Sequence, residues 1–509
     1  TSNFICMSIR PLYIFNTLKG EKELFVPIVE SRVGMYVCGP TVYSDVHLGN
    51  CRTFVSFDVI YRYLLHLGYK VRYVRNITDV GHLVGDVDTG AEDKIGKKAR
   101  TEAVEPMEIV QRYSNGFHDI MKLFNTLEPS IEPSATGHII EQIQMVQDIM
   151  DNGLAYEMNG SVYFDTLKYA EETGQYGKLS GRIIDDLITE SRDDLKNQSE
   201  KKHPSDFALW IKADESHLMR WPSKWSIGFP GWHLECSAMS TKYLGKTFDI
   251  HGGGQDLKFP HHENEIAQNF GASGCNPAKY WMHGNMLLMN GKKMSKSDGN
   301  SILPYELISG QNDIFPEAFS PMAIRFFMAQ SNYRSTLDIT YDALKAAQKG
   351  FTRIREAYQL IDKLSFQAGN EDIKINLDIK GEIEAMYEDM SNDFNTPKTI
   401  ARLYELVSII NIYYNNPTTA DGLNEASIEL LRNTFDTFLG DIMGIQIKEN
   451  TTISQDNHTD GLMEVILTLR AQARENKDWT SSDLIRDKLG AMNIQVKDGK
   501  EGVTWSVVK

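Results

Sequence analysis

Near its N-terminus the chain reads Gly34-Met35-Tyr36-Val37-Cys38-Gly39-Pro40, an apolar run that ends in a turn signal. Residues 58–67 follow with their apolar side chains on one helical face, and residues 71–77 alternate with a period of two. A strand, a helix and a second strand at these lengths form a βαβ unit. We therefore expect an α/β fold built on a parallel sheet.

The composition is that of a large globular protein. Its 509 residues exceed what one hydrophobic core usually organises, so we expect about three to five domains. A content of 41% hydrophobic and 24% charged residues excludes a mainly disordered chain. The 53 Lys and Arg against 69 Asp and Glu give a net charge of −16, which argues against a non-specific nucleic-acid coat but leaves a specific RNA partner open.

Two features bear on location. No run of about 18 apolar residues is present, so we expect no membrane partner. Five cysteines in a chain of this length make no disulfide framework, so we expect a reducing, cytoplasmic setting. Residues 1–6 precede the first methionine, Met7, and we expect them to lie outside the fold.

Periodicity and composition divide the chain into regions. We expect a Rossmann-like domain over residues 7–128 and 227–300, interrupted by an insertion over 129–226. A helical period indicates a bundle over 341–455. After a polar linker, residues 456–509 form a small module of two helices and two short strands.

Finer predictions concern single elements. We expect a strand over 248–251, a glycine loop over 252–254 and a helix over 261–270, while the polar run over 185–203 indicates an exposed loop. Further helices are predicted over 104–126, 137–152, 341–364, 378–392, 398–414 and 426–439.

A lysine motif, Lys293-Met294-Ser295-Lys296-Ser297, lies between Gly291 and Gly299. Two lysines with small hydroxyl residues between them and glycines on both sides indicate a loop that closes over a polyphosphate. Its ammonium groups would stabilise the negative charge that builds up during phosphoryl or nucleotidyl transfer. The alternative is a solvated lysine loop, but chance produces this string rarely.

A second motif, Pro40-Thr41-Val42-Tyr43-Ser44-Asp45-Val46-His47-Leu48-Gly49-Asn50, follows the first strand and opens a helix. His47 near a helix N-terminus can donate to a phosphate, and Gly49 lets a base or ribose approach the backbone. Together the two motifs resemble the class I aminoacyl-tRNA synthetases, which combine a His-x-Gly-His signature with a Lys-Met-Ser-Lys-Ser loop. Asn50 stands where that family has its second histidine.

Side chains that can bind a metal ion occur at Cys38, Cys236, His261 and Glu265. Two thiolates, an imidazole and a carboxylate are a zinc set, and residues 261 and 265 are one turn apart on the predicted helix. Spacing alone leaves His262 and Glu263 open as alternatives to His261 and Glu265.

Within the class, the chain resembles the cysteinyl-tRNA synthetases over nearly its whole length. Besides the motifs above, the resemblance rests on Tyr36–Thr41, Arg75–Asp79 and Asp393–Pro397. It implies ATP-dependent ligation of L-cysteine to its tRNA through a cysteinyl-adenylate. It also implies one Zn²⁺ that selects the substrate thiolate, ATP as substrate with Mg²⁺, and a monomer.

The resemblance implies the role of each site residue. The zinc ligands are Cys38, Cys236, His261 and Glu265. The catalytic residues are His47, Lys293 and Lys296. The ATP-binding residues are Thr41, His47, Gly49, Asn50, Gly253, Asp256 and Lys296. The cysteine-binding residues are Gly39, Thr78 and Trp232. The anticodon-binding residues, in a C-terminal anticodon-binding module, are Arg474, Trp479, Asp483 and Asp498.

The resemblance also implies that residues 301–340, with Arg325 and the run Tyr333-Arg334-Ser335, contact the inner corner of the tRNA. Two other functions are less consistent with the sequence. A ligase that joins cysteine to an amino sugar would not need residues 461–509, and an inactive RNA-binding paralogue would be expected to lose the lysine loop or the metal set. Residues 461–509 therefore argue against the first function, and the intact lysine loop and metal set argue against the second.

Zinc explains how cysteine is separated from serine, which differs by one atom. A zinc ion binds a thiolate at about 2.3 Å and lowers the thiol pKa so that it ionises at neutral pH. The serine hydroxyl is harder and far less acidic, so a separate editing site is unnecessary.

Overall fold

The computed structural model describes residues 10–81, 93–182, 201–294, 299–365, 374–416, 423–447, 455–491, 494–499 and 502–507. The chain divides into two compact units, Thr1–Ile447 and Lys448–Lys509. None of the helices that the structure describes combines the length and the apolar character of a bilayer-spanning segment.

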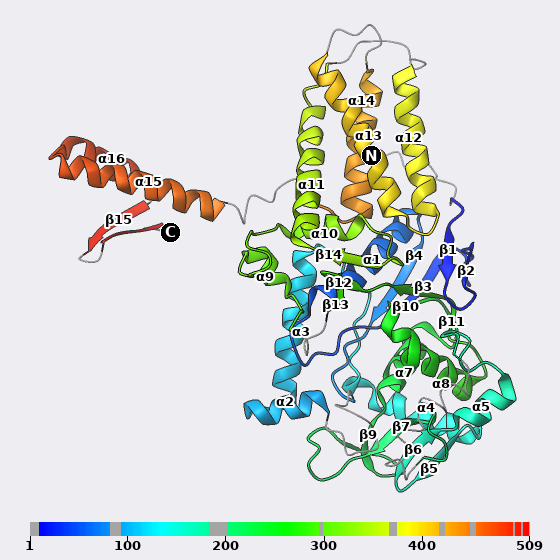
Figure 1. Cartoon of the computed structure of the whole chain (residues 1–509). Helices are drawn as coiled ribbons and strands as arrows, with labels where there is room; N and C mark the ends of the chain where they lie inside the picture. Colours follow the sequence, from blue (N-terminus) through cyan, green and yellow to red (C-terminus); the bar gives the residue numbers. More distant parts are fainter. Residues whose placement is uncertain are drawn as a thin grey trace. The chain divides into compact units, whose positions relative to one another are not determined.

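A four-stranded parallel sheet lies in the first unit (Figure 1). Its strands, in spatial order, are β11 (Ala278–Gly284), β10 (Phe248–Gly254), β3 (Arg32–Val37) and β4 (Lys70–Arg75). Val37 lies beside Gly252 on one side and Arg75 on the other, so the carboxyl ends of three strands meet at one edge. The predicted parallel α/β sheet is confirmed.

Helices cover this sheet and extend from it. They are α1 (Leu48–His66), α2 (Lys94–Glu102), α3 (Pro106–Leu123), α7 (Trp232–Leu244) and α8 (Glu263–Ser273). α1 and α7 pack against the strands, and α8 packs on α7. α1 begins directly after His47, as expected of a motif that opens a helix, and it joins this start to the helical run over 58–67. The His47 side chain caps it, accepting a hydrogen bond from the Asn50 amide.

Two local predictions about the second half of the sheet are wrong. Residues 252–254 are the end of β10, not a loop, and a Cβ at Gly252 would lie 2.2 Å from the Phe57 ring of α1. The missing side chain therefore lets helix and strand approach closely. The helix expected from residue 261 begins at Glu263, and the preceding turn, Lys258–His262, includes the extended residue Phe259.

The inserted segment forms its own antiparallel sheet. Its strands, in spatial order, are β5 (Ala155–Met158), β6 (Ser161–Phe164), β7 (Phe207–Lys212), β9 (Ile227–Pro230) and β8 (Trp221–Pro222), with helices α4 (Ile139–Asp151) and α5 (Thr166–Thr173). Since β9 pairs with β7 and β8, this sheet continues to Pro230, past the expected boundary at 226. Most of the predicted loop over 185–203 lies outside the described residues.

Two smaller sheets join the first unit. One is the hairpin β1 (Tyr13–Asn16) and β2 (Glu21–Leu24). The other has the spatial order β13 (Lys292–Lys293), β12 (Leu287–Met289) and β14 (Leu337–Ile339), in which β12 runs antiparallel to β13 and parallel to β14. The short helices α9 (Pro304–Ser309) and α10 (Pro321–Ala329) lie between β13 and β14 in the chain.

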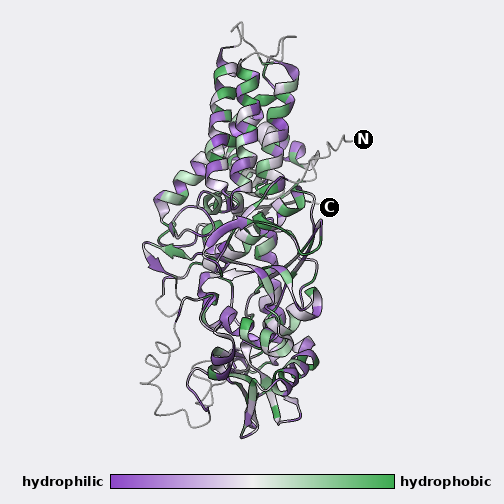
Figure 2. Ribbon diagram, turned by 90° about the vertical axis from the view of Figure 1, so that its right-hand side faces the viewer, coloured by the Kyte–Doolittle hydropathy of each residue, from purple (hydrophilic) through white to green (hydrophobic). Residues whose placement is uncertain are grey.

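The four helices predicted for the bundle are present. They are α11 (Tyr341–Ile361), α12 (Lys374–Ser391), α13 (Thr396–Asn415) and α14 (Glu425–Phe435), followed by the π-helical turn η7 (Asp436–Ile442). Each carries apolar and polar residues, as Figure 2 shows. Their buried side chains, such as Leu406 and Phe438, belong to the same hydrophobic core as Met35 of β3. The sheet and the bundle therefore belong to one compact unit.

Arg325, which was expected to belong to the region that contacts the inner corner of the tRNA, is completely buried. Its guanidinium pairs with Asp58 of α1 and donates to the carbonyl oxygens of Met443 (2.7 Å) and Phe124 (2.6 Å). A side chain with no exposed surface cannot itself contact RNA, so Arg325 has a structural place within this region. Arg325 joins α10 to α1 and to the end of the bundle.

Replacing Asp58 with alanine is expected to lower the free energy of unfolding by about 3–5 kcal/mol, because it leaves buried cations without their anion. The Asp58 carboxylate also accepts from Arg62 Nε (2.7 Å) and from the Leu127 amide (2.7 Å). Denaturant unfolding followed by circular dichroism measures the effect. In Glu317→Gln, which removes the exposed pair with Lys345, the midpoint should stay unchanged; equal shifts in both variants would contradict the prediction.

The second unit contains the two helices and two strands predicted for it. They are α15 (Gln455–Glu475), α16 (Trp479–Ala491), β15 (Ile494–Gly499) and β16 (Gly502–Val507), the strands forming an antiparallel hairpin.

Candidate functional site

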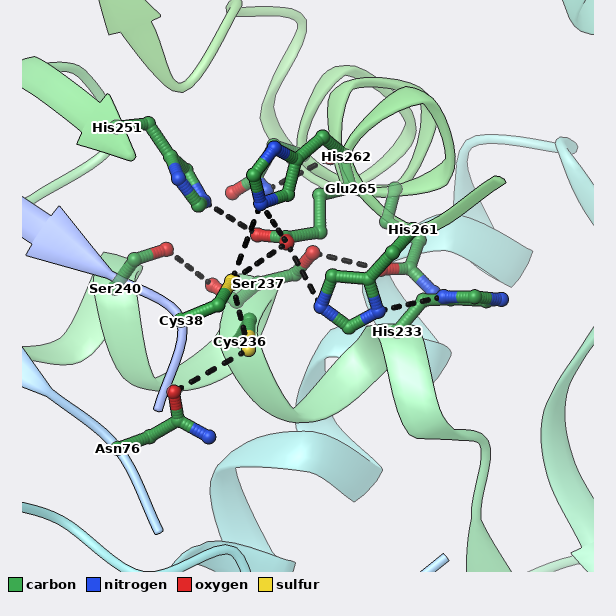
Figure 3. Close-up of polar contacts among 12 residues, drawn as sticks. Cys38, Asn76, His233, Cys236, Ser237, Ser240, His251, His261, His262 and Glu265 are labelled. Carbon is green, nitrogen blue, oxygen red and sulfur yellow. Dashed lines mark hydrogen bonds and ion pairs between the residues drawn. The ribbon is translucent and has the colours of Figure 1, made fainter. Parts of the chain in front are cut away.

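Four buried side chains converge at the carboxyl edge of the parallel sheet (Figure 3). Cys38 follows β3, and Cys236 lies on α7. His261 lies in the turn before α8, and Glu265 lies in the first turn of α8. Cys38 Sγ is 3.7 Å from Cys236 Sγ and 3.6 Å from Glu265 Oε1. His261 Nε2 is 3.1 Å from the same carboxylate oxygen. The structure thus brings together the four residues predicted as a zinc set.

The protonation of these groups suits a metal ion. Burial acts to raise the pKa of Cys236, but the Cys38 thiol and His261 lower this pKa to about 6. Burial also acts to raise the pKa of Glu265, which His251 and His261 lower to about 2. For Cys38, burial raises the thiol pKa. Burial acts to lower the pKa of His261, which Cys236 and Glu265 raise to about 10. The ligand atoms lie within 4.8 Å of one another, so the donor set fits a soft cation that would displace the protons of Cys38 and His261.

A second layer of imidazoles supports this cluster. His251 Nε2 is 2.8 Å from Glu265 Oε2, and His262 Nε2 is 3.3 Å from Cys38 Sγ. His262 Nδ1 in turn lies 2.8 Å from His283 Nε2. Burial lowers the pKa of His283 to about 3 and that of His262 well below its usual value, so both rings are neutral. Neutral imidazoles orient the ligands without adding positive charge beside a cation.

Of the two alternative ligands that the spacing left open, Glu263 points away from the cluster and His262 lies beside it. Glu263 Oε2 accepts a hydrogen bond of 2.8 Å from the amide of Ser180, away from the cluster. His262 stays beside it, since Cys38, His251, His262 and Glu265 form a second group within ligand distance. Sequence reasoning did not assign a role to His251; its place in a buried strand before the glycine run was the available signal.

A cavity of about 480 Å³ opens beside the cluster of Cys38, Cys236, His261 and Glu265. Of the predicted site residues, those that line it are Cys38, Gly39, Thr41, His47, Asn50, Trp232 and Asp256. Lining residues that were not predicted include Thr53, Phe54 and Leu257. Because Cys38 belongs to both the cluster and the cavity wall, a small molecule in the cavity would reach the metal ligands directly.

Gly49, Gly253 and Lys293, which were also predicted, do not line the cavity. A Cβ at Gly49 would lie 3.0 Å from the His47 ring, and a Cβ at Gly253 would lie 2.9 Å from His262. Lys293 is exposed in β13. Lys296 lies outside the described residues, so its role stays a prediction.

Asn76 organises the part of the site predicted to bind cysteine, a role that sequence reasoning missed. Its Oδ1 accepts from the Gly39 amide (2.9 Å), and its Nδ2 donates to Thr78 Oγ1 (3.0 Å). The same Oδ1 is 3.6 Å from Cys236 Sγ. Asn76 is fully buried, so it fixes Gly39 and Thr78 relative to Cys236 and the cluster. Its position in the quoted segment Arg75–Asp79 was the only signal.

The residues predicted to bind an anticodon lie in the second unit. Arg474 is on α15, Trp479 and Asp483 are on α16, and Asp498 is in β15. The Trp479 side chain is 59% exposed. Asp483 is 3.1 Å from Arg486. An exposed indole is available for stacking, which a core tryptophan would not be.

Three family models match successive parts of the chain. The model of the tRNA synthetases class I (C) catalytic domain matches residues 24–349. The DALR domain matches residues 385–448, and the cysteinyl-tRNA ligase anticodon binding domain matches residues 460–505.

Solved structures show the same fold at low sequence identity. Methionyl-tRNA synthetase from Mycobacterium tuberculosis, in complex with methionyl-adenylate, is 12% identical with a TM-score of 0.56, covering 81% of this chain and 89% of that one. A LeuRS–tRNA–LeuAMS ternary complex from Agrobacterium radiobacter K84 has a TM-score of 0.55 at 11% identity, covering 82% and 85%.

Curated relatives match over nearly the full length. The cysteine–tRNA ligase of Bacteroides thetaiotaomicron is 52% identical over 98% of this chain and 99% of its own length. That of Cytophaga hutchinsonii is 49% identical with the same coverage of each chain. With the catalytic-domain match and the convergent Cys-Cys-His-Glu cluster, these findings show that the chain belongs to the cysteine–tRNA ligase family of class I tRNA synthetases.

Proposed function

We propose that this chain ligates L-cysteine to its tRNA at the expense of ATP, through a cysteinyl-adenylate. The observation that carries the proposal is the shared wall: Cys38 is both a member of the thiol-imidazole-carboxylate cluster and a lining residue of the cavity that begins at the His47–Asn50 signature. One small molecule can therefore contact the cluster with its side chain and a nucleotide with its carboxylate.

Cys38, Cys236, His261 and Glu265 would hold one Zn²⁺. When bound, the ion supplies a Lewis-acid centre that favours a thiolate over a hydroxyl. The chain's own contribution is a buried pocket of two thiols, an imidazole and a carboxylate, with the neutral rings of His262 and His283 behind them. Such a pocket rewards a soft anionic ligand and leaves a serine hydroxyl unpaired.

Other residues of the cavity would orient the two substrates. Gly39 and Thr78, fixed by Asn76, would face the amino group of cysteine, and the Trp232 ring would pack on its side chain. This ring already lies 4.4 Å from that of His261, centroid to centroid. Attack by the substrate carboxylate on the α-phosphate then depends on holding the two groups in line.

The nucleotide would occupy the opposite end of the cavity. Thr41, Asn50 and the Gly253–Gly254 backbone would contact ATP, and Asp256 would accept from the ribose hydroxyls. His47, Lys293 and Lys296 would stabilise the charge on the phosphates as pyrophosphate leaves, with Mg²⁺ accompanying ATP. No covalent enzyme intermediate is required.

The second unit would read the tRNA anticodon through Arg474, Trp479, Asp483 and Asp498, by stacking and by hydrogen bonds to base edges. In the first unit, part of residues 301–340 would contact the inner corner of the tRNA. We further propose that the protein acts as a cytoplasmic monomer.

The test is ATP–pyrophosphate exchange with the full-length protein, in which cysteine and serine are compared and bound zinc is measured by elemental analysis. Cysteine should support exchange, serine should not, and about one zinc should be bound per chain. Prolonged chelation should abolish exchange, and added Zn²⁺ should restore it. Equal exchange with both amino acids, or active protein without zinc, would refute the proposed selectivity.

A further inference from the structure

Arg52, on the first turn and a half of α1, is a buried cation with an unusual set of partners. Its side chain is only 1% exposed. Within the part of the chain that the structure describes, its guanidinium pairs with no carboxylate and bonds oxygens of two loops instead. Burial lowers the pKa of Arg52 to about 10, so the group stays charged at neutral pH.

The two loops immediately precede β12 and β14, two strands of the small sheet that carries Lys293. Arg52 Nη1 donates to the carbonyl oxygens of Asn285 (3.1 Å) and Met286 (2.6 Å), immediately before β12. Its Nη2 donates to those of Asn332 (3.2 Å) and Ser335 (2.5 Å), shortly before β14. One side chain thus fixes the starts of two adjacent strands.

These strands determine where Lys293 lies. β12 pairs in parallel with β14 on one side, and on the other it pairs with β13, in which Lys293 lies opposite Leu288. A rotation of β12 about its start would therefore move Lys293 with it. Backbone hydrogen bonds, such as that from the Asn285 amide to the Tyr333 carbonyl oxygen (2.7 Å), also join the two loops, and Arg52 ties both loops to α1.

The same helix carries the other half of the phosphate site. His47 caps α1, and Arg52 projects from the helix five positions later. A backbone hydrogen bond of 2.9 Å from Leu48 to Ile302 ties the start of α1 to the segment that follows the lysine motif. Arg52 completes this attachment from the segment that precedes the motif.

We infer that Arg52 is a positioning residue that sets the distance between His47 and Lys293, so that both reach the phosphates of one ATP molecule. The inference rests on the proposed function for its chemistry. Arg52 does not line the cavity and acts through the sheet. Arginine is required because its planar group offers five donors in a fixed arrangement, whereas lysine offers three on one atom and cannot hold two loops apart.

A double-mutant cycle tests the inference. ATP–pyrophosphate exchange is measured for the wild type, Arg52→Lys, Lys293→Ala and the double variant. Arg52→Lys should lower kcat about tenfold or more and leave the KM for cysteine unchanged. If Arg52 acts through Lys293, the double variant should retain about fivefold or more activity above the product of the two single effects. Additive effects would overturn the inference.

Arg325→Lys is the matched control, because Arg325 is also a buried arginine that donates to carbonyl oxygens but touches neither β12 nor β14. Its effect should add to that of Lys293→Ala. Arg52→Gln serves as a second variant, so that the coupling does not depend on one substitution.

Hydrogen exchange gives a readout that does not need catalysis. Amide protection at β12 and β14 should fall about tenfold or more in Arg52→Lys and stay unchanged in Arg325→Lys. Wild-type protein without cysteine-dependent exchange would refute the proposed function, whereas unchanged protection at β12 and β14 would refute the role of Arg52.

Discussion

Replacing Cys236 with serine is expected to lower cysteine-dependent ATP–pyrophosphate exchange about a thousandfold, equivalent to ~4 kcal/mol. The Cys236 side chain is 1% exposed, and the Cys38 thiol and His261 bring its pKa to about 6 against the effect of burial. Serine at this position would present a hydroxyl that does not ionise at neutral pH. The cluster would then lose its most acidic thiol, and with it most of its affinity for zinc.

The measurement combines exchange kinetics with elemental analysis of the purified variant, and Cys275→Ser is the matched control. Cys275 is a free, partly exposed cysteine outside the cluster. The control should keep wild-type zinc and wild-type exchange. A Cys236→Ser variant that keeps both would show that Cys236 does not hold the ion.

Replacing Gly39 with alanine is expected to reduce cysteine-dependent exchange on the order of a hundredfold. A Cβ at Gly39 would lie 1.6 Å from the carbonyl oxygen of Asn76, which is backbone and cannot swing aside. The ends of β3 and β4 would have to separate, which would displace Cys38 and Thr78. The KM for cysteine should rise, and thermal unfolding should begin at a lower temperature.

Gly381→Ala controls for the substitution itself. Gly381 lies inside α12, and a Cβ there would meet nothing within 4 Å. Alanine should stabilise this helix slightly and leave exchange unchanged. If Gly39→Ala behaved like this control, the close approach of β3 and β4 would have no functional role.

The sequence predicted the architecture where local pattern and long-range packing agree. The period-two run over 71–77 and the helical runs over 341–439 all form the expected elements, because the burial of one face decides each of them. The glycine run over 252–254 was misjudged because glycine is typical of turns. Its strand conformation depends on the Phe57 ring of α1, which no local pattern reveals.

The candidate site was predictable to the extent that residue chemistry alone identifies a ligand. Two cysteines, a histidine and a glutamate form a recognisable set wherever they meet. Asn76 carries no such signal, since its role comes from three contacts that only the folded chain creates. Arg325 shows that the sequence does not reveal what a single arginine does, because an arginine in a region expected to bind RNA is also the residue best able to neutralise a buried aspartate.

The hydrophobic core common to the parallel sheet and the bundle has a consequence for genetics. A bundle side chain such as Leu406 or Phe438 supports the platform on which amino-acid activation takes place, although it lies far along the chain from every activating residue. Selections for loss of activation should therefore recover alleles in the bundle even when no nucleic acid is present in the screen. Such alleles would lower the stability of the shared core, and their loss of activation should not be attributed to RNA recognition.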